Sequence, residues 1–178
     1  MKRIFAALLV CCLLLFSGCS AAQKQLKPED LNFVFSCQAD ITTQNGSYTC
    51  AIERAGLHSV SVEVLSENGT GLKWYWNGDG FRQTYQGMTE ESPTCDLPDN
   101  SFASLIVNVL DCAQQPNALE SAGGNVFRGN LKGNSFAISA DGNTGNIIQL
   151  TVSDYNITAA FRNFTKPAFE SVFAESHP

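Results

Sequence analysis

The sequence predicts an α+β domain that is mostly antiparallel β-sheet, with about nine strands and one covering helix. Polar and apolar residues alternate over most of the chain, which is the period of strands with one buried face. Turn signals rich in asparagine and glycine separate these stretches by only a few residues, too few for the crossovers that parallel strands need. Residues 102–110 instead space their apolar residues by three and four, which is the period of a helix.

The N-terminus, residues 1–18, is predicted to be a bacterial lipoprotein signal peptide. Lys2 and Arg3 precede an apolar run, Ile4 to Phe16, that is too short to cross a bilayer. Phe16-Ser17-Gly18-Cys19 resembles a lipobox, with phenylalanine where leucine is usual, and it predicts lipidation of Cys19. The alternative is ordinary secretory cleavage after Ser20-Ala21-Ala22.

The remaining chain is predicted to hold a polar tether, residues 19–30, and a single domain, residues 31–178. The formal net charge is −6 and basic residues form no cluster, so nucleic acid is a poor partner. We expect the membrane contact to be the acyl chain on Cys19. The protein would then be exported and anchored to the outer face of the cytoplasmic membrane or to the outer membrane.

The first strands are expected in two groups. Residues 31–42 and 47–55 alternate around an Asn45-Gly46 turn, which predicts a hairpin that ends at Gly56. Residues 57–86 then form a three-stranded meander, broken at 67–69 and at 77–80.

The second half begins with a predicted loop, residues 88–96. Ser101 is among several N-cap candidates before the helix at 102–110. Residues 113–124 are again predicted to be a loop, with Pro116 and paired glycines. The last four strands are predicted at 125–131, 134–140, 146–152 and 155–164. The tail from 167 to 178 could add a short strand or helix.

Cysteines predict two disulfides, because an exported chain with four remaining cysteines commonly pairs them. The pair Cys95–Cys112 is favoured, since it would tie the two ends of the predicted helix, and it leaves Cys37–Cys50. The Asn45-Gly46 turn would place Cys50 opposite Ile41, so that second pair needs a wider loop. No C-x-x-C spacing is present and histidines are few, so no metal site is expected.

A row of large apolar residues in the meander and in a later strand is the candidate binding surface. These residues could line a groove for acyl chains, which apolar pockets hold by area burial, or they could be core beneath the helix. The candidates are Val62, Leu72, Trp74, Trp76, Phe81 and Phe136.

Catalytic patterns are not found. A nucleophile–histidine pair would have to use His58 or His177, and neither G-x-S-x-G nor H-E-x-x-H occurs. The acidic pair Glu90-Glu91 lies in a predicted loop. Asp141 to Gly145 begins like a calcium loop but lacks the downstream ligands, so a turn is expected there. We expect no enzyme and no cofactor.

The order of these elements resembles the LolA/LppX superfamily of bacterial lipoprotein and lipid carriers. The resemblance covers about residues 31–165 and rests on the 33–41 strand, the 74–78 turn region, the helix and the 141–147 hairpin. It implies a curved half-barrel sheet with an apolar concave face under the helix. The chain departs from the carriers in its short polar segment before the first strand and in its four cysteines.

The function that this resemblance implies is non-catalytic: an envelope lipoprotein that binds a lipid or acyl ligand on the concave face. The alternative is a protein-interaction module with a sealed core and no small-molecule ligand. In that case the polar loops 87–96 and 113–124 would contact an envelope protein partner.

Overall fold

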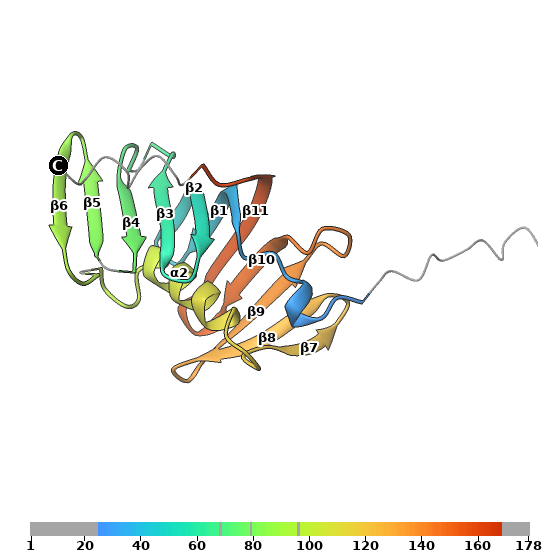
Figure 1. Ribbon diagram of the computed structural model, residues 1–178. Helices are drawn as coiled ribbons and strands as arrows, with labels where there is room; N and C mark the ends of the chain where they lie inside the picture. Colours follow the sequence, from blue (N-terminus) through green and yellow to red (C-terminus); the bar gives the residue numbers. More distant parts are fainter. Residues whose placement is uncertain (1–24, 68, 79, 96, 169–178) are drawn as a thin grey trace, which may run out of the picture.

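The computed structural model describes residues 25–67, 69–78, 80–95 and 97–168. These residues form one open antiparallel sheet of eleven strands, in the order β6-β5-β4-β3-β2-β1-β11-β10-β9-β8-β7, with helix α2 (Phe102–Ala113) against one face (Figure 1). The sheet curves around the helix, so the predicted half-barrel with one covering helix is confirmed. No helix among the described residues is long and apolar enough to cross a membrane.

The strands follow the predicted alternation, and their ends lie close to the turn signals. In chain order they are β1 Phe35–Thr43, β2 Gly46–Gly56, β3 Ser59–Val64, β4 Lys73–Asn77, β5 Phe81–Tyr85, β6 Met88–Ser92, β7 Glu120–Gly123, β8 Val126–Leu131, β9 Asn134–Ala140, β10 Ile147–Val152 and β11 Ile157–Thr165. The helix begins after Ser101, whose side-chain oxygen accepts a hydrogen bond from the backbone N–H of Ser104 at 3.2 Å.

Two strands were predicted to be loops. β6 and β7 form the two edges of the sheet, and almost all of their residues are exposed. An edge strand without a buried face has no reason to alternate apolar and polar residues, so its sequence shows no strand period.

The first hairpin turns one residue earlier than predicted. Thr43 pairs with Gly46, so the turn is Gln44-Asn45 and Gly46 is the first residue of β2. Gly46 has a φ of 141°, a conformation that residues with a side chain rarely adopt. As a result Ile41 pairs with Tyr48, and Cys50 pairs with Ala39 rather than with Ile41.

The N-terminal segment packs onto the half of the sheet that contains β7 to β10. The predicted signal peptide and Cys19 lie outside the described residues, but Leu26, within the predicted tether, is already buried. Its backbone N–H donates to Asn125 Oδ1 at 2.8 Å. A Cβ at Gly145 would collide with the carbonyl oxygen of Asp30, so only glycine lets this segment, including the short 3-10 helix η1 (Pro28–Asp30), lie so close.

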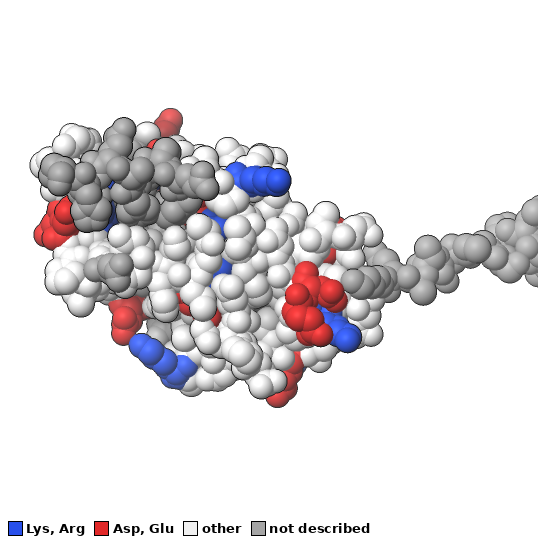
Figure 2. All heavy atoms as spheres, in the orientation of Figure 1, with Lys and Arg blue, Asp and Glu red and all other residues white. Residues whose placement is uncertain are grey.

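Charged groups are dispersed over the exposed surface. On the face shown in Figure 2, small groups of basic and acidic side chains are scattered among wide uncharged areas. Three of the ion pairs join side chains of neighbouring strands: Lys73 with Glu63, Arg82 with Glu91, and Arg162 with Asp40. Such solvent-accessible pairs contribute little stability, so the buried face of the sheet must supply most of it.

The packing of α2 against the sheet predicts a large difference between two isoleucines. Ile106 on α2 is fully buried, whereas Ile148 on β10 is 43% exposed. Ile106→Ala leaves a cavity in the core and should lower the free energy of unfolding by about 2–5 kcal/mol. Ile148→Ala should change it by only about 0.5 kcal/mol. Urea unfolding followed by circular dichroism measures both, and equal losses would contradict this assignment of the core.

Candidate functional site

The concave face of the sheet is covered by α2. Nine of the twelve helix residues are buried, which leaves little of the helix exposed. At its N-terminal end the Phe102 ring stacks on Tyr48, with ring centroids 4.8 Å apart, and meets the edge of Trp74 at 5.8 Å. Phe102 therefore closes the space between the helix and the start of the meander.

The six predicted ligand-binding residues are mostly part of the core. Val62, Trp74, Phe81 and Phe136 are at most 6% exposed, and Leu72 and Trp76 are half-buried and pack against the same core. The Trp74 indole N–H donates to Gln83 Oε1 at 2.9 Å. The structure brings five of the six together: Val62 lies on β3, Trp74 and Trp76 on β4 and Phe81 on β5, and Leu72 directly precedes β4.

Phe136 lies apart from the other five. It is on β9, and strands β2, β1, β11 and β10 separate β9 from β3. At about 4.8 Å per strand, this places Phe136 roughly 24 Å along the sheet from Val62. It packs instead over Gly129 on β8, where a Cβ would collide with its ring.

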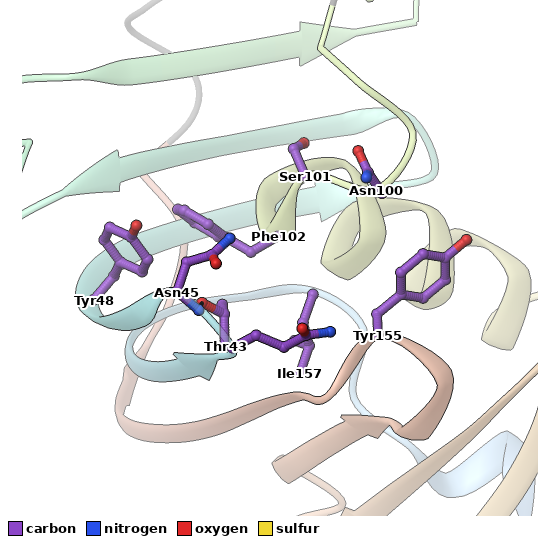
Figure 3. A pocket seen from close by; sticks show the side chains of 9 residues that line it. Thr43, Asn45, Tyr48, Asn100, Ser101, Phe102, Tyr155 and Ile157 are labelled. Atoms are coloured by element: carbon purple, nitrogen blue, oxygen red, sulfur yellow. Dashed lines mark hydrogen bonds between the residues drawn. The ribbon is translucent and has the colours of Figure 1, made fainter.

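A pocket of about 370 Å³ opens beside Phe102, at the N-terminal end of α2 (Figure 3). Three segments that are far apart in the sequence form it: the β1–β2 turn, the start of α2, and the chain from the short 3-10 helix η2 (Ser153–Tyr155) into β11. We call it the helix-end pocket; its lining residues are Thr43, Gln44, Asn45, Tyr48, Asn100, Ser101, Phe102, Tyr155 and Ile157.

None of the six predicted residues lines the helix-end pocket. The sequence did indicate a turn near residue 45 and an N-cap near residue 101, but neither signal says that these ends meet. Phe102 links the two regions, because one ring borders the pocket and also contacts Trp74.

A buried ionic cluster holds the other end of α2. Arg54, on the inner face of β2, is fully buried, and its guanidinium donates to Asp111 Oδ1 at 2.6 Å, to Gln114 Oε1 at 2.8 Å and to the Phe33 carbonyl oxygen at 2.6 Å. Burial lowers the pKa of Arg54, and the hydrogen bond and charge of Asp111 oppose that shift. Arginine remains charged in proteins, so the pair is ionic.

The same carboxylate also fixes the turn between β2 and β3. Asp111 Oδ2 accepts the backbone N–H of His58 at 3.2 Å and lies 2.9 Å from His58 Nδ1. His58 has a φ of 55°, which places it in the left-handed region. The alternation of β2 puts Arg54 on the face of Cys50 and Ile52, so the sequence pattern indicates a buried arginine, but nothing in it identifies Asp111 as the partner.

The four cysteines of the domain are free thiols. Cys95 Sγ lies 3.9 Å from Ser104 Oγ, near the start of α2. Cys112 lies eight residues after Ser104 on the same helix, and its thiol donates to the Asn130 carbonyl oxygen at 3.5 Å. Eight residues of helix span about 12 Å, too far for the favoured Cys95–Cys112 bond. Cys37 and Cys50 share the buried face, but they pair with Ile52 and Ala39, and they form no disulfide in this structure.

The predicted turn at Asp141 to Gly145 uses its own polar groups. Asp141 Oδ1 accepts from the backbone N–H groups of Asn143 and Thr144 and from the Thr144 hydroxyl. These bonds, above all the one from the Thr144 hydroxyl, lower the pKa of Asp141. Within the described ranges no group of three potential metal-binding side chains occurs. Residue 79 of the other glycine-rich turn lies outside them, as do His177 and the rest of the tail from residue 169.

The ionic cluster predicts an unequal response to the loss of two carboxylates. Asp111→Ala leaves the Arg54 guanidinium buried without a counter-charge, so the free energy of unfolding should fall by about 3–5 kcal/mol. Glu63→Ala removes a half-buried, solvent-accessible partner of Lys73 and should cost at most about 1 kcal/mol. Urea unfolding measures both, and a small loss for Asp111→Ala would show that the cluster does not hold α2.

Thiol reactivity is expected to differ among the four cysteines. Burial raises the pKa of Cys37 and of Cys50 to about 12, so almost no thiolate is present at mildly alkaline pH. In the folded protein, iodoacetamide should modify the exposed Cys95 and spare Cys37 and Cys50, as judged by peptide mass spectrometry. After unfolding without a reductant all four should react; cysteines that need a reductant first would indicate a disulfide.

Comparisons with known proteins identify similar structures but no family by sequence. No family model matches the chain, and no curated protein matches it. An uncharacterized conserved protein from Thermus thermophilus is similar in structure, with a TM-score of 0.52 and 8% identity over 84% of this chain and 88% of that one.

Two further structures are LprF from Mycobacterium bovis and a LolA superfamily protein from Nitrosomonas europaea. LprF has 10% identity and a TM-score of 0.40, covering 82% of this chain and 91% of its own. The LolA superfamily protein has 5% identity and a TM-score of 0.39, covering 82% of this chain and 90% of its own. At 8% identity, the likeness to the Thermus thermophilus protein concerns the fold alone.

Proposed function

We propose that this protein is a non-catalytic, lipid-anchored binding protein of the cell envelope that takes up an apolar or amphipathic ligand between α2 and the concave sheet. The observation that carries the proposal is the position of the helix-end pocket, which adjoins the apolar core at Phe102. The lining is mostly polar, but Phe102 and Ile157 contribute apolar surface to it.

The route for an acyl chain passes the Phe102 ring. Phe102 is only half-buried, and its ring contacts the rings of Tyr48 and Trp74. The ionic cluster holds α2 at its opposite end, near Asp111. A displacement of one aromatic side chain would therefore join the pocket to the row that contains Val62 and Trp74.

The size of the pocket fits part of a lipid chain. A volume of about 370 Å³ lies at the low end of the range for small-molecule sites, roughly 300–1,000 Å³. Each methylene group that leaves water contributes about 0.8 kcal/mol, so extension past Phe102 would favour longer chains.

A protein-interaction module remains the second candidate, because the predicted ligand row is well buried as it stands. Val62 is fully buried and Trp74 is 6% exposed, as in a sealed core. The predicted contact loops at 87–96 and 113–124 contain the two edge strands β6 and β7, whose backbone groups on one side pair with no described strand. A partner could add to either edge.

The two tryptophans of the chain are internal reporters of ligand uptake. Trp74 and Trp76 both lie on β4, beside the proposed route. Dodecanoate brominated along its chain should quench their fluorescence in a saturable manner, because bromine quenches only at short range. Trp76→Phe should preserve quenching of the remaining Trp74.

A matched pair of variants tests the route. Phe102→Ala removes the ring between the pocket and Trp74, so quenching should become stronger. Tyr85→Ala, which removes an aromatic side chain on β5 that is 37% exposed, should leave quenching unchanged. Absence of saturable quenching in the parent protein and in Phe102→Ala, together with a ligand-free native mass spectrum, would reject uptake and favour the interaction module.

A further inference from the structure

The helix-end pocket has a lining without charge. Its nine residues include no lysine, arginine, histidine, aspartate or glutamate. Besides apolar surface from Phe102 and Ile157, they present amide groups, from Gln44, Asn45 and Asn100, and hydroxyl groups, from Thr43, Tyr48, Ser101 and Tyr155. Amides and hydroxyls both donate and accept hydrogen bonds, which suits a ligand whose own groups do both.

Most of these polar groups are available to a ligand. Thr43 Oγ1 is engaged within its own turn, since it donates to the Gly46 carbonyl oxygen and accepts from the Asn45 backbone N–H. Ser101 caps α2. The side-chain amides and the two tyrosine hydroxyls, in contrast, make no hydrogen bond to any other residue that the structure describes. They belong to Gln44, Asn45, Asn100, Tyr48 and Tyr155.

Aromatic faces accompany these polar groups. Tyr48 and Phe102 form a stacked pair with an interplanar angle of 24°, and Tyr155 lies across the pocket from Tyr48 (Figure 3). Flat rings next to neutral donors and acceptors match a molecule that has apolar C–H faces and a rim of hydroxyl groups. A charged head group would lose water here without gaining a counter-charge.

We propose that the helix-end pocket binds a neutral, polyhydroxylated group, that is, a sugar. The inference rests on the proposed function in one respect: a chain that passes Phe102 would leave its head group in this pocket. The sugar can be the head of an amphiphile or a free saccharide, and the chemistry of recognition is the same for both.

Three probes separate the head group from the chain: dodecyl maltoside below its micelle concentration, dodecanoate, and maltose, each titrated by calorimetry. The maltoside is expected to bind about tenfold more tightly than dodecanoate, because its hydroxyl groups add neutral hydrogen bonds to the pocket's amides and hydroxyls. Measurable binding of maltose alone would also support the sugar site and would identify a free saccharide as a sufficient ligand.

Two variants assign the sugar contacts. Asn100→Ala and Tyr155→Phe each remove one polar group and should weaken maltoside binding by about three- to tenfold, with dodecanoate binding unchanged. Gln149→Ala, on the exposed side of β10, is the control and should alter neither. Circular dichroism and urea unfolding confirm that each variant is folded.

The outcomes distinguish the sugar site from the proposed function. Equal affinities for the maltoside and dodecanoate, unaffected by the two pocket variants, would overturn the sugar site and leave uptake of apolar chains intact. Binding of maltose that depends on Asn100 and Tyr155, without any binding of dodecanoate, would support the sugar site and reject acyl uptake. Failure of all three probes to bind would overturn both.

Discussion

The position of α2 depends on the buried pair Arg54–Asp111. A buried charge is costly unless it is paired, and Arg54 is paired with Asp111 on α2 and bonded to the chain just before β1. The directional hydrogen bonds of Arg54 therefore fix the C-terminal end of α2 more strictly than apolar packing alone would do, because apolar packing has no preferred direction. The helix-end pocket lies at the opposite end of α2, where the contacts are aromatic rather than ionic.

Strands with a buried face could be predicted from the sequence, and the edges could not. Val60, Val62 and Val64 alternate because each points into the core, whereas β6 and β7 are exposed and show no such period. The single helix was predicted from its apolar spacing, and Ser101 was recognised as an N-cap candidate. The first hairpin has a different register from the predicted one, because Gly46 is the first residue of β2 rather than part of the turn. The presence of a glycine near the turn therefore did not fix which two residues form it.

The candidate site shows a similar division. Apolar residues on β3, β4 and β5 were predicted to share a surface, and they do, although helix α2 covers that surface. The pocket could not be predicted, because it needs Asn45, Asn100 and Tyr155 to meet, and their proximity follows from the whole topology rather than from any local pattern. The same applies to Asp111, whose partner Arg54 lies 57 residues earlier in the chain.

The open sheet leaves two outer edges, on β6 and β7, and both carry glutamates. Glu90 and Glu91 lie on β6, and Glu120 begins β7. Two copies of the chain that approached edge to edge would bring like charges together, in a domain that is already acidic. An open half-barrel can thus avoid polymerising through its own strands, because its acidic edges repel one another where a closed barrel would have no edges at all.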